Sequence, residues 1–320
     1  MAIDLLNGLL FAHSFDKDLS LDYSFFENVE DPPYIAGSPY IDTTNYKLGG
    51  GSVYADGLTD IFGSRFTPPN TTQSWHKEDL YMDATNNMTF AVWARPLKNI
   101  NIVSESTSGA AGVSGQSYLV PSLNTTVYYY TWANINYTGL GLSVGNNGIM
   151  VIEHGNGLIP SLCTLEKSIP NDSFTFILIE VEAMQPKISV NNVLERVGLT
   201  SPRTRMYWAF VFAKLASYGN WLGNIDQPMW WNRLLTQEEK DVLWNNGDGL
   251  SLSKIIYPPN SVNLLNIKES QSGLSLLSES ASGLEVITES ASGLEVITES
   301  TSGLNVITES ASKLTGLKEI

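Results

Sequence analysis

Residues 223–249 read GNIDQPMWWNRLLTQEEKDVLWNNGDG and join a predicted strand to a predicted helix. The run from Asn224 to Trp230 is short, rich in apolar residues and bounded by turn residues, as strands are. Thr236 stands three residues before Glu239, the spacing of a capping box in which each side chain accepts a hydrogen bond from the other residue's backbone. Asn246-Gly247 is a helix-ending pair. The stretch therefore predicts a strand followed by one short helix, which we expect to pack over a sheet edge.

Strand-like runs recur throughout the chain before this segment. Each is short, alternates apolar and polar residues, and lies between turns rich in Gly, Asn and Pro. Their density over about 250 residues predicts an all-β fold, a two-sheet antiparallel sandwich of the jelly-roll type with one short C-terminal helix. The runs are Leu9–Phe15, Met88–Ala94, Ser117–Val120, Val127–Trp132, Ile149–Glu153, Phe174–Val181, Lys187–Val190 and Tyr207–Phe212.

The composition changes sharply near residue 260. All eight Trp, fourteen Tyr, eleven Phe and fourteen Pro residues lie before residue 261. The remaining 60 residues form six units of ten, two of which are identical copies of ASGLEVITES. We therefore predict a jelly-roll domain at 1–250, a linker at 251–260 and a repetitive β array at 261–320.

One repeat unit is sufficient to predict a strand. Leu284–Thr288 is rich in β-branched residues, which favour strands. The apolar spacing also fits a helix, but a Gly in nearly every unit disfavours one. One decapeptide cannot bury its apolar side chains alone, so the array is expected to stack on itself, on sister chains or on another protein. A flexible Ser-rich linker is the alternative. The candidate assembly residues are Leu284, Val286, Ile287, Leu294, Val296 and Ile297.

Charge and composition exclude several classes of protein. The chain carries 18 Lys+Arg against 33 Asp+Glu, a net charge of −15, which disfavours nucleic-acid binding. Its 42% apolar content excludes a disordered protein. The single cysteine, Cys163, cannot form an internal disulfide. No signal peptide or membrane-spanning segment is recognisable, so we expect synthesis in a cytoplasm and no insertion into a membrane.

Four segments resemble a known family. They are GLLFAHSFDKDLSLDYS at 8–24, MTFAVWARPLKN at 88–99, FTFILIEVEAMQPKISVNNVLER at 174–196, and 223–249. Together they are similar to the laminin-G-like and concanavalin-A-like jelly rolls. The resemblance implies a fold more firmly than a function, since such domains include glycan-binding modules, glucanases and structural or adhesive modules. In the last segment, Asp226 matches the family pattern and is expected to hold the final strand to the helix turn.

Aromatic residues are the candidates for glycan binding. Alternate positions of the 127–132 run share one strand face, and two aromatic faces cannot both be core without crowding. In the pair at 230–231, one ring is expected to face outward, and a polar stretch at 73–77 holds the least core-like tryptophan. The alternative is that all these rings fill the sandwich. The candidates are Trp75, Tyr128, Tyr130, Trp132 and Trp231.

Catalytic and metal-binding patterns are weak. Glu180 and Glu182 share one strand face, about 7 Å apart, but the Glu-x-Asp-x-x-Glu pattern of the related glucanases is absent. Cys163 is expected to be a buried small hydrophobe. Two aspartate sets could bind calcium, yet neither has the spacing of a calcium loop, so no resident cofactor or metal is predicted. The sets are Asp42, Asp56 and Asp60, and Asp16, Asp18 and Asp22.

The repeats carry a second resemblance. The sequence ITESASGL is similar to degenerate repeats found in bacteriophage virion and fibre proteins. We therefore expect a non-enzymatic virion protein, a fibre or decoration component with a lectin-like head for host-surface glycans. Its partners would be other virion proteins and copies of itself, for example in a trimer. The alternatives are a glycoside hydrolase of the same fold and an exported cellular adhesion domain.

Overall fold

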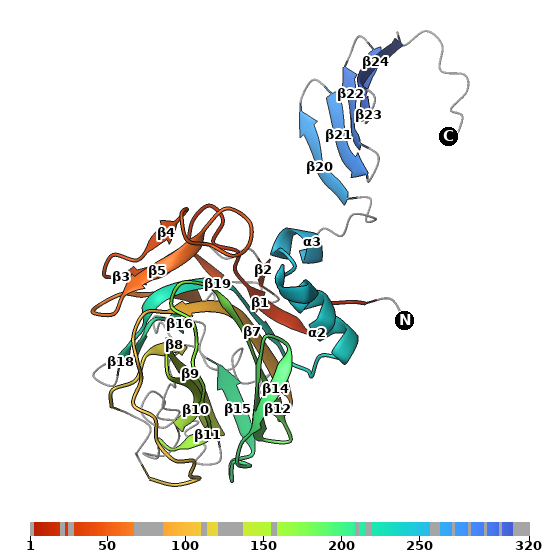
Figure 1. Ribbon diagram of the computed structural model, residues 1–320. Coiled ribbons are helices and arrows are strands. Elements are labelled where there is room, and N and C mark those ends of the chain that lie inside the picture. Colours follow the sequence, from red (N-terminus) through yellow and green to blue (C-terminus); the bar gives the residue numbers. More distant parts are fainter. Residues whose placement is uncertain are drawn as a thin grey trace. The chain divides into compact units, whose positions relative to one another are not determined.

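The computed structural model describes most of the chain. The described residues are 3–19, 23–24, 29–66, 86–109, 114–120, 137–154, 159–208, 211–215, 219–256, 263–270, 273–280, 283–290, 293–300 and 303–309. Contacts divide the chain into two compact units, Met1–Leu252 and Ser253–Ile320. The first unit is built from mainly antiparallel sheets, in which β15 pairs with β9 in parallel, and the second contains a sheet formed by the repeats (Figure 1).

The larger sheet of the first unit has nine strands. Its order is β14-β13-β12-β7-β19-β1-β2, and β19 also pairs with β5, which in turn pairs with β4. The strands are β1 (Leu9–Ala12), β2 (Tyr23–Ser24), β4 (Tyr40–Asp42), β5 (Ser52–Asp56), β7 (Met88–Pro96), β12 (Thr175–Glu182), β13 (Gln185–Val190), β14 (Val193–Val197) and β19 (Leu222–Trp231).

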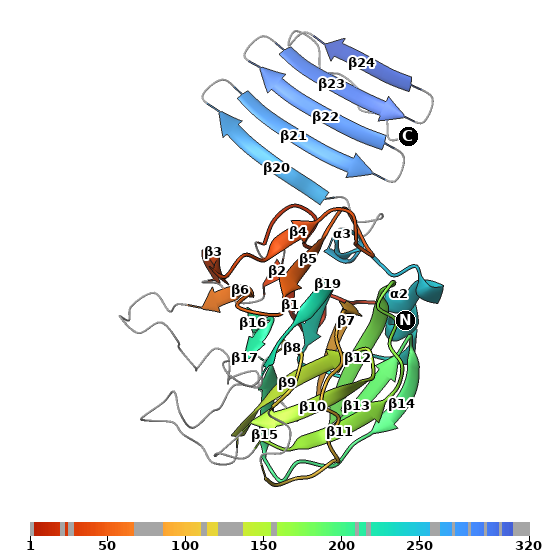
Figure 2. The same cartoon turned by 60° about the vertical axis from the view of Figure 1, so that its left-hand side comes forward.

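A five-stranded sheet, ordered β11-β10-β9-β15 with β8 paired to β9, forms the second layer (Figure 2). Its strands are β8 (Tyr118–Val120), β9 (Tyr137–Gly145), β10 (Gly148–His154), β11 (Ser161–Glu166) and β15 (Arg205–Trp208). Two small sheets complete the unit: β3 (Val29–Ala36), β6 (Ile61–Phe66) and β16 (Val211–Phe212) form one, and β17 (Lys214–Leu215) and β18 (Gly219–Asn220) the other.

One hydrophobic core lies between the two larger sheets. It contains Val92 and Ile177 from the nine-stranded sheet together with Leu142 and Val151 from the five-stranded sheet, all fully buried. Strand alternation supplies these residues, because every second side chain of a strand projects to the same face. The predicted all-β sandwich is therefore confirmed. The expected strand at 127–132 lies outside the described residues.

The predicted helix, α2 (Gln237–Trp244), has the expected capping box, in which the Thr236 hydroxyl accepts from the Glu239 backbone and the Glu239 carboxylate from that of Thr236. Its expected position over a sheet edge is wrong. Trp244 stacks on Trp93 of β7 at 5.5 Å and packs near Phe176 of β12, both internal strands of the sheet. Large aromatic rings on the outer sheet face need cover, and the helix provides it.

A second short helix, α3 (Leu252–Ile256), lies where a linker was expected. It follows η1 (Asn245–Gly247), a short 3-10 helix. Gln227 holds the start of α3, because its side-chain oxygen accepts from the Leu252 backbone at 2.6 Å. Its amide nitrogen donates to the Leu250 carbonyl at 2.6 Å. The chain is thus ordered beyond residue 250 by a glutamine in β19.

The repeats form a five-stranded antiparallel meander of β20 (Asn263–Ser270), β21 (Gly273–Ser280), β22 (Gly283–Ser290), β23 (Gly293–Ser300) and β24 (Gly303–Glu309). The predicted strand state is therefore confirmed. The register places Val286 opposite Ile297 and Ile287 opposite Val296. Leu284 pairs with Glu279, and Leu294 pairs with Glu289 on one side and with Glu309 on the other. A leucine position thus separates Glu289 from Glu309.

Candidate functional site

A row of four residues crosses the outer face of the nine-stranded sheet. The register pairs Tyr40 of β4 with Tyr54 of β5, Tyr54 with Asn224 of β19, and Asn224 with Arg95 of β7. Residues directly opposite one another in paired strands project to the same face. The intervening positions Val53, Ile225 and Ala94 belong to the hydrophobic core. The four residues, named here the tyrosine row, therefore lie on the face away from the core.

Other parts of this outer face are covered by side chains. Trp93 is overlaid by Trp244 and by the Lys47 ammonium, which lies 4.8 Å from the ring centroid. The two tyrosines of the row remain accessible, because Tyr40 is 53% exposed and Tyr54 is partly exposed. The two rings lie against each other, with centroids 5.2 Å apart and planes inclined by 38°. The pair presents a broad aromatic surface to solvent.

Polar contacts hold the row in place. The Asn224 amide nitrogen donates to Asp42 Oδ2 at 3.1 Å and to the Ser52 hydroxyl at 3.0 Å. Arg95 Nη1 donates to Asn224 Oδ1 at 3.2 Å, and Arg95 Nε donates to the Asn171 carbonyl at 2.9 Å. Asn224 is fully buried, and its amide bridges Arg95 to Asp42 and Ser52.

Asp42 organises the loop that follows β4. Its carboxylate accepts hydrogen bonds from the Thr44 backbone and hydroxyl and from the Asn45 backbone and side chain. Burial opposes the charge, but these donors together hold the pKa of Asp42 well below its usual range. Burial, reinforced by the Asp42 charge and by Tyr54, raises the pKa of Tyr40. The Tyr40 phenol therefore keeps its proton at neutral pH and remains a hydrogen-bond donor.

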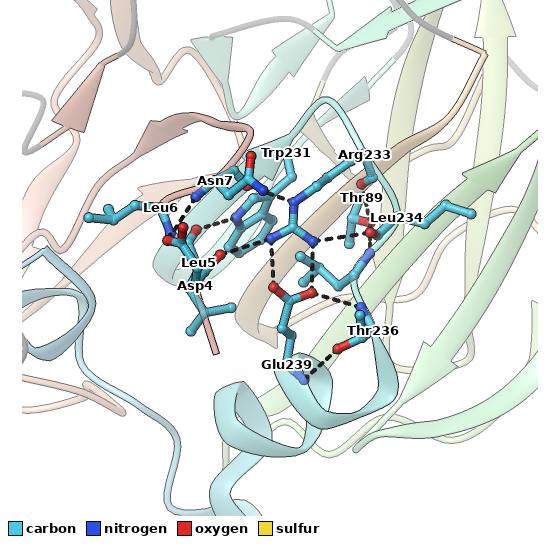
Figure 3. Close-up of polar contacts among 11 residues, drawn as sticks. Asp4, Leu5, Leu6, Asn7, Thr89, Trp231, Arg233, Leu234, Thr236 and Glu239 are labelled. Carbon is cyan, nitrogen blue, oxygen red and sulfur yellow. Dashed lines mark hydrogen bonds and ion pairs between the residues drawn. The ribbon is translucent and has the colours of Figure 1, made fainter. Parts of the chain in front are cut away.

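Trp231 is not exposed, contrary to the sequence-based prediction. It is 0% exposed, and its indole nitrogen donates to the Leu5 carbonyl at 2.8 Å (Figure 3). Trp230 is also buried, on the core side. Both rings of the pair are therefore structural, because the N-terminal segment covers the face on which Trp231 lies. The other candidates, Trp75, Tyr128, Tyr130 and Trp132, lie outside the described residues.

Arg233 fixes that N-terminal segment. Its guanidinium forms a two-pronged ion pair with Glu239 at 2.6 and 2.7 Å and donates to the carbonyls of Asp4 and Asn7 (Figure 3). Arg233 thus joins the segment around Asp4 and Asn7 to Glu239 of α2. The capping box identified Glu239 from the sequence, but its ion pair with Arg233 is seen only in the structure.

The paired glutamates of β12 each have a basic partner. Glu180 is buried and contacts the Lys240 ammonium of α2 at 3.2 Å, whereas the exposed Glu182 pairs with Lys187. Cys163 is buried, and burial together with the Glu105 charge raises the pKa of its thiol to about 12. The thiolate, which is the reactive form of cysteine, is therefore strongly disfavoured.

Four of the six aspartates considered for calcium, Asp16, Asp42, Asp56 and Asp60, accept hydrogen bonds from the backbone, and Asp22 lies outside the described residues. Asp60 accepts from Ser38 and Asp56 at 2.7 and 2.8 Å, and Asp16 accepts from Gly50 at 2.8 Å. Within the described ranges, no group of three or more His, Cys, Asp or Glu side chains is arranged to hold a metal ion. Likewise, none of the helices in the described ranges is long and apolar enough to cross a membrane.

Comparisons with known proteins assign no family. No family model and no curated protein matches the sequence. One similar solved structure is domain 4 of AbnA, a GH43 extracellular arabinanase from Geobacillus stearothermophilus, in complex with arabinotriose. It is 15% identical to this chain with a TM-score of 0.44, and the match covers 72% of this chain and 95% of that one. The receptor binding domain of botulinum neurotoxin C/D mosaic serotype is 13% identical with a TM-score of 0.49, covering 93% and 72%.

A third similar structure is the ligand binding domain of botulinum neurotoxin serotype D in complex with N-acetylneuraminic acid. It is 11% identical with a TM-score of 0.47 and covers 93% of this chain and 72% of that one. At such identities, and with TM-scores below 0.5, these proteins do not define the function of this chain. None of them corresponds to the bacteriophage resemblance of the repeats.

Proposed function

We propose that the first unit is a glycan-binding module and that the tyrosine row is its binding surface. The observation that carries the proposal is the exposed Tyr40–Tyr54 pair on an outer sheet face. The apolar C–H face of a sugar ring packs against aromatic rings, while polar groups at the edge orient its hydroxyls. The phenol groups and the exposed Asp56 carboxylate beside the row provide such polar groups.

We also propose that this module is not an enzyme. Glycoside hydrolysis uses two carboxylates about 5 to 10 Å apart in a groove, one of which must be able to transfer a proton. Glu180 and Glu182, the best pair in the sequence, are each engaged by a lysine. Asp42, the carboxylate nearest Tyr40 along β4, is held by backbone and amide donors, which supports a role in binding rather than proton transfer.

For the whole chain we propose a virion component of a bacteriophage, a fibre or decoration protein that displays several glycan-binding heads. The repeat meander supports an assembly role, because aliphatic positions recur in it while Trp, Tyr and Phe are absent. Single sugar sites bind weakly, and several copies on one particle raise the apparent affinity through effective concentration. Its partners in assembly would be other virion proteins and copies of the same chain.

The binding proposal is tested by replacing the exposed rings. Tyr40→Ala and Tyr54→Ala each remove one half of the aromatic surface, so affinity for any glycan bound by the wild-type chain should fall about five- to tenfold. Binding is measured on a glycan array and quantified by calorimetry. Leu194→Ala is the control, since Leu194 is an exposed apolar residue of β14, on the far side of the same sheet. Undiminished glycan binding by both folded tyrosine variants would contradict the proposal.

A further inference from the structure

We propose that the tyrosine row selects neutral saccharides and discriminates against sialylated or sulfated ones. This inference rests on the proposed function, because it names the ligand class of the same surface. It follows from the negative charges on either side of Tyr40 and Tyr54 and from the contacts that the nearby basic groups already make.

Carboxylates flank the tyrosine pair along the strands. Positions two apart in a strand share a face, so Asp42 lies on the face of Tyr40 and Asp56 on the face of Tyr54, each about 7 Å along its strand. Because β4 and β5 are antiparallel and Tyr40 pairs with Tyr54, the two aspartates lie on opposite sides of the pair. Asp56 is exposed.

A third carboxylate lies on the Asp56 side. Asp60 accepts hydrogen bonds from the Ser38 and Asp56 backbones, which ties it to the ends of both strands beyond the tyrosines. The three aspartates therefore surround the aromatic surface, although they are too widely distributed to share one metal ion. A ligand on the two rings experiences negative potential from both sides.

Among the residues that the structure describes, three cations of this sheet and its loops are already engaged. Arg95 donates to the Asn171 carbonyl and to Asn224 Oδ1, and the buried Asn224 separates it from Tyr54. Lys47 lies over the Trp93 ring, and the Lys98 ammonium donates to the Asn220 carbonyl. Recruiting any of these groups to an anionic sugar would cost an existing contact.

The energetic consequence differs for the two ligand classes. A sugar carboxylate or sulfate would meet like charges on both sides of the rings and a chain of net charge −15, and like-charge contacts oppose association. The hydroxyls of a neutral sugar can instead donate to the exposed Asp56 carboxylate. Binding of a neutral sugar should also depend little on salt, because no ion pair forms across the interface.

The test compares glycans that share a core and differ in charge. Full-length protein is titrated with lactose and with 3′-sialyllactose, and the comparison is repeated on an array of neutral glycans and their sialylated or sulfated counterparts. We expect the neutral member of each pair to bind about tenfold more tightly. Asp56→Asn should reduce this ratio by relieving the repulsion of the acidic member, whereas Glu238→Gln, which removes an exposed carboxylate on α2, should leave it unchanged.

Equal or tighter binding of the acidic members would overturn the inference while leaving glycan binding itself intact. A ratio unaffected by Asp56→Asn would also overturn it. The absence of binding to every neutral and acidic probe would instead overturn the proposed function on which it rests. Tyr54→Ala should weaken both members of a pair, which separates the role of the ring from the role of charge.

Discussion

Asp226 is a carboxyl group buried within β19. Its Oδ2 accepts from the backbones of Lys47 and Leu48 at 2.7 and 2.9 Å, whereas its Oδ1 is buried without a hydrogen-bond partner. Burial, reinforced by the charge of Asp16, raises the pKa of Asp226 to about 8 despite the backbone donors. The sequence suggested that Asp226 ties the last strand to the helix turn, but it secures the loop between β4 and β5.

The raised pKa of Asp226 predicts how stability changes with pH. The folded protein keeps a proton that the unfolded chain releases above its ordinary pKa of 3.8, so the free energy of unfolding should fall as pH rises from about 4 to about 8. The slope is on the order of 1 kcal/mol per pH unit from this residue. Chemical denaturation at intervals between pH 5 and pH 9 measures it.

Asp226→Asn provides the control for this pH dependence. Asparagine keeps an oxygen for the two backbone donors but carries no titrating proton, so the slope should decrease while stability near pH 8 is retained or improved. Part of the slope should remain, because burial also raises the pKa of Glu153. An unchanged pH profile in the variant would show that Asp226 does not titrate in this range.

At the scale of elements, the sequence predicts those features that depend on contacts between residues close together in the chain. The capping box of α2 was recognisable because Thr236 and Glu239 contact each other across three residues. The two-residue turn at Asn191-Asn192 has positive φ at both residues, as a type I′ hairpin needs and asparagine tolerates. The cover over Trp93 and Trp231 was not predictable, because it depends on segments far away in the sequence.

The tyrosine row illustrates the same limit. Alternation within β4 or β5 places each tyrosine on a face, but their pairing with each other and with Asn224 and Arg95 depends on strand order and register. The two tyrosines are close in sequence, but the pairings of Tyr54 with Asn224 and of Asn224 with Arg95 join residues more than 100 positions apart. The 127–132 run is recognisable in the sequence because its aromatics are clustered, whereas Tyr40 and Tyr54 are isolated. Nothing local distinguishes them from core tyrosines.

Strand β14 is an exposed edge with its own protection against aggregation. Among the described strands it pairs only with β13, and Val193, Leu194 and Val197 are 58%, 54% and 43% exposed. A register shift leaves Glu195 as an extra residue, since Ser189 pairs with Leu194 and Ile188 with Arg196. Bulges and charges on edge strands prevent pairing with other chains. Glu195, which also pairs with Lys167, combines both devices.

Glu195→Val should therefore promote self-association through β14. The substitution removes the acidic residue at the bulge and leaves Arg196 as the only charged residue of β14, so light scattering at high protein concentration should show aggregates larger than any assembly of the wild-type chain. Glu182→Val is the matched control, since Glu182 is likewise exposed and paired with a lysine but lies on an internal strand. Identical size distributions for the two variants would argue against a protective role for Glu195.

At the scale of the whole molecule, the two units differ in how they achieve stability. The unit Met1–Leu252 has a core between two sheets, filled by side chains from both. The repeat meander is one sheet, and adjacent aliphatic positions such as Val286 and Ile287 fall on opposite faces because strand side chains alternate. Apolar positions thus recur on both faces, and a sheet of this pattern gains stability when each face is covered.

Removing the repeats should therefore separate assembly from folding. Each decapeptide offers two or three aliphatic side chains, worth roughly 1.5 to 3 kcal/mol each when buried, against an ordering cost on the order of 1–2 kcal/mol per residue. An isolated array gains too little free energy from burial, whereas association with sister chains or a virion surface multiplies the buried area.

A chain ending at residue 260 should remain folded and monomeric, while the full chain forms homo-oligomers and joins particles. Light scattering and particle incorporation measure the two properties, and a truncated chain that still oligomerises and incorporates normally would remove the assembly role from residues 261–320.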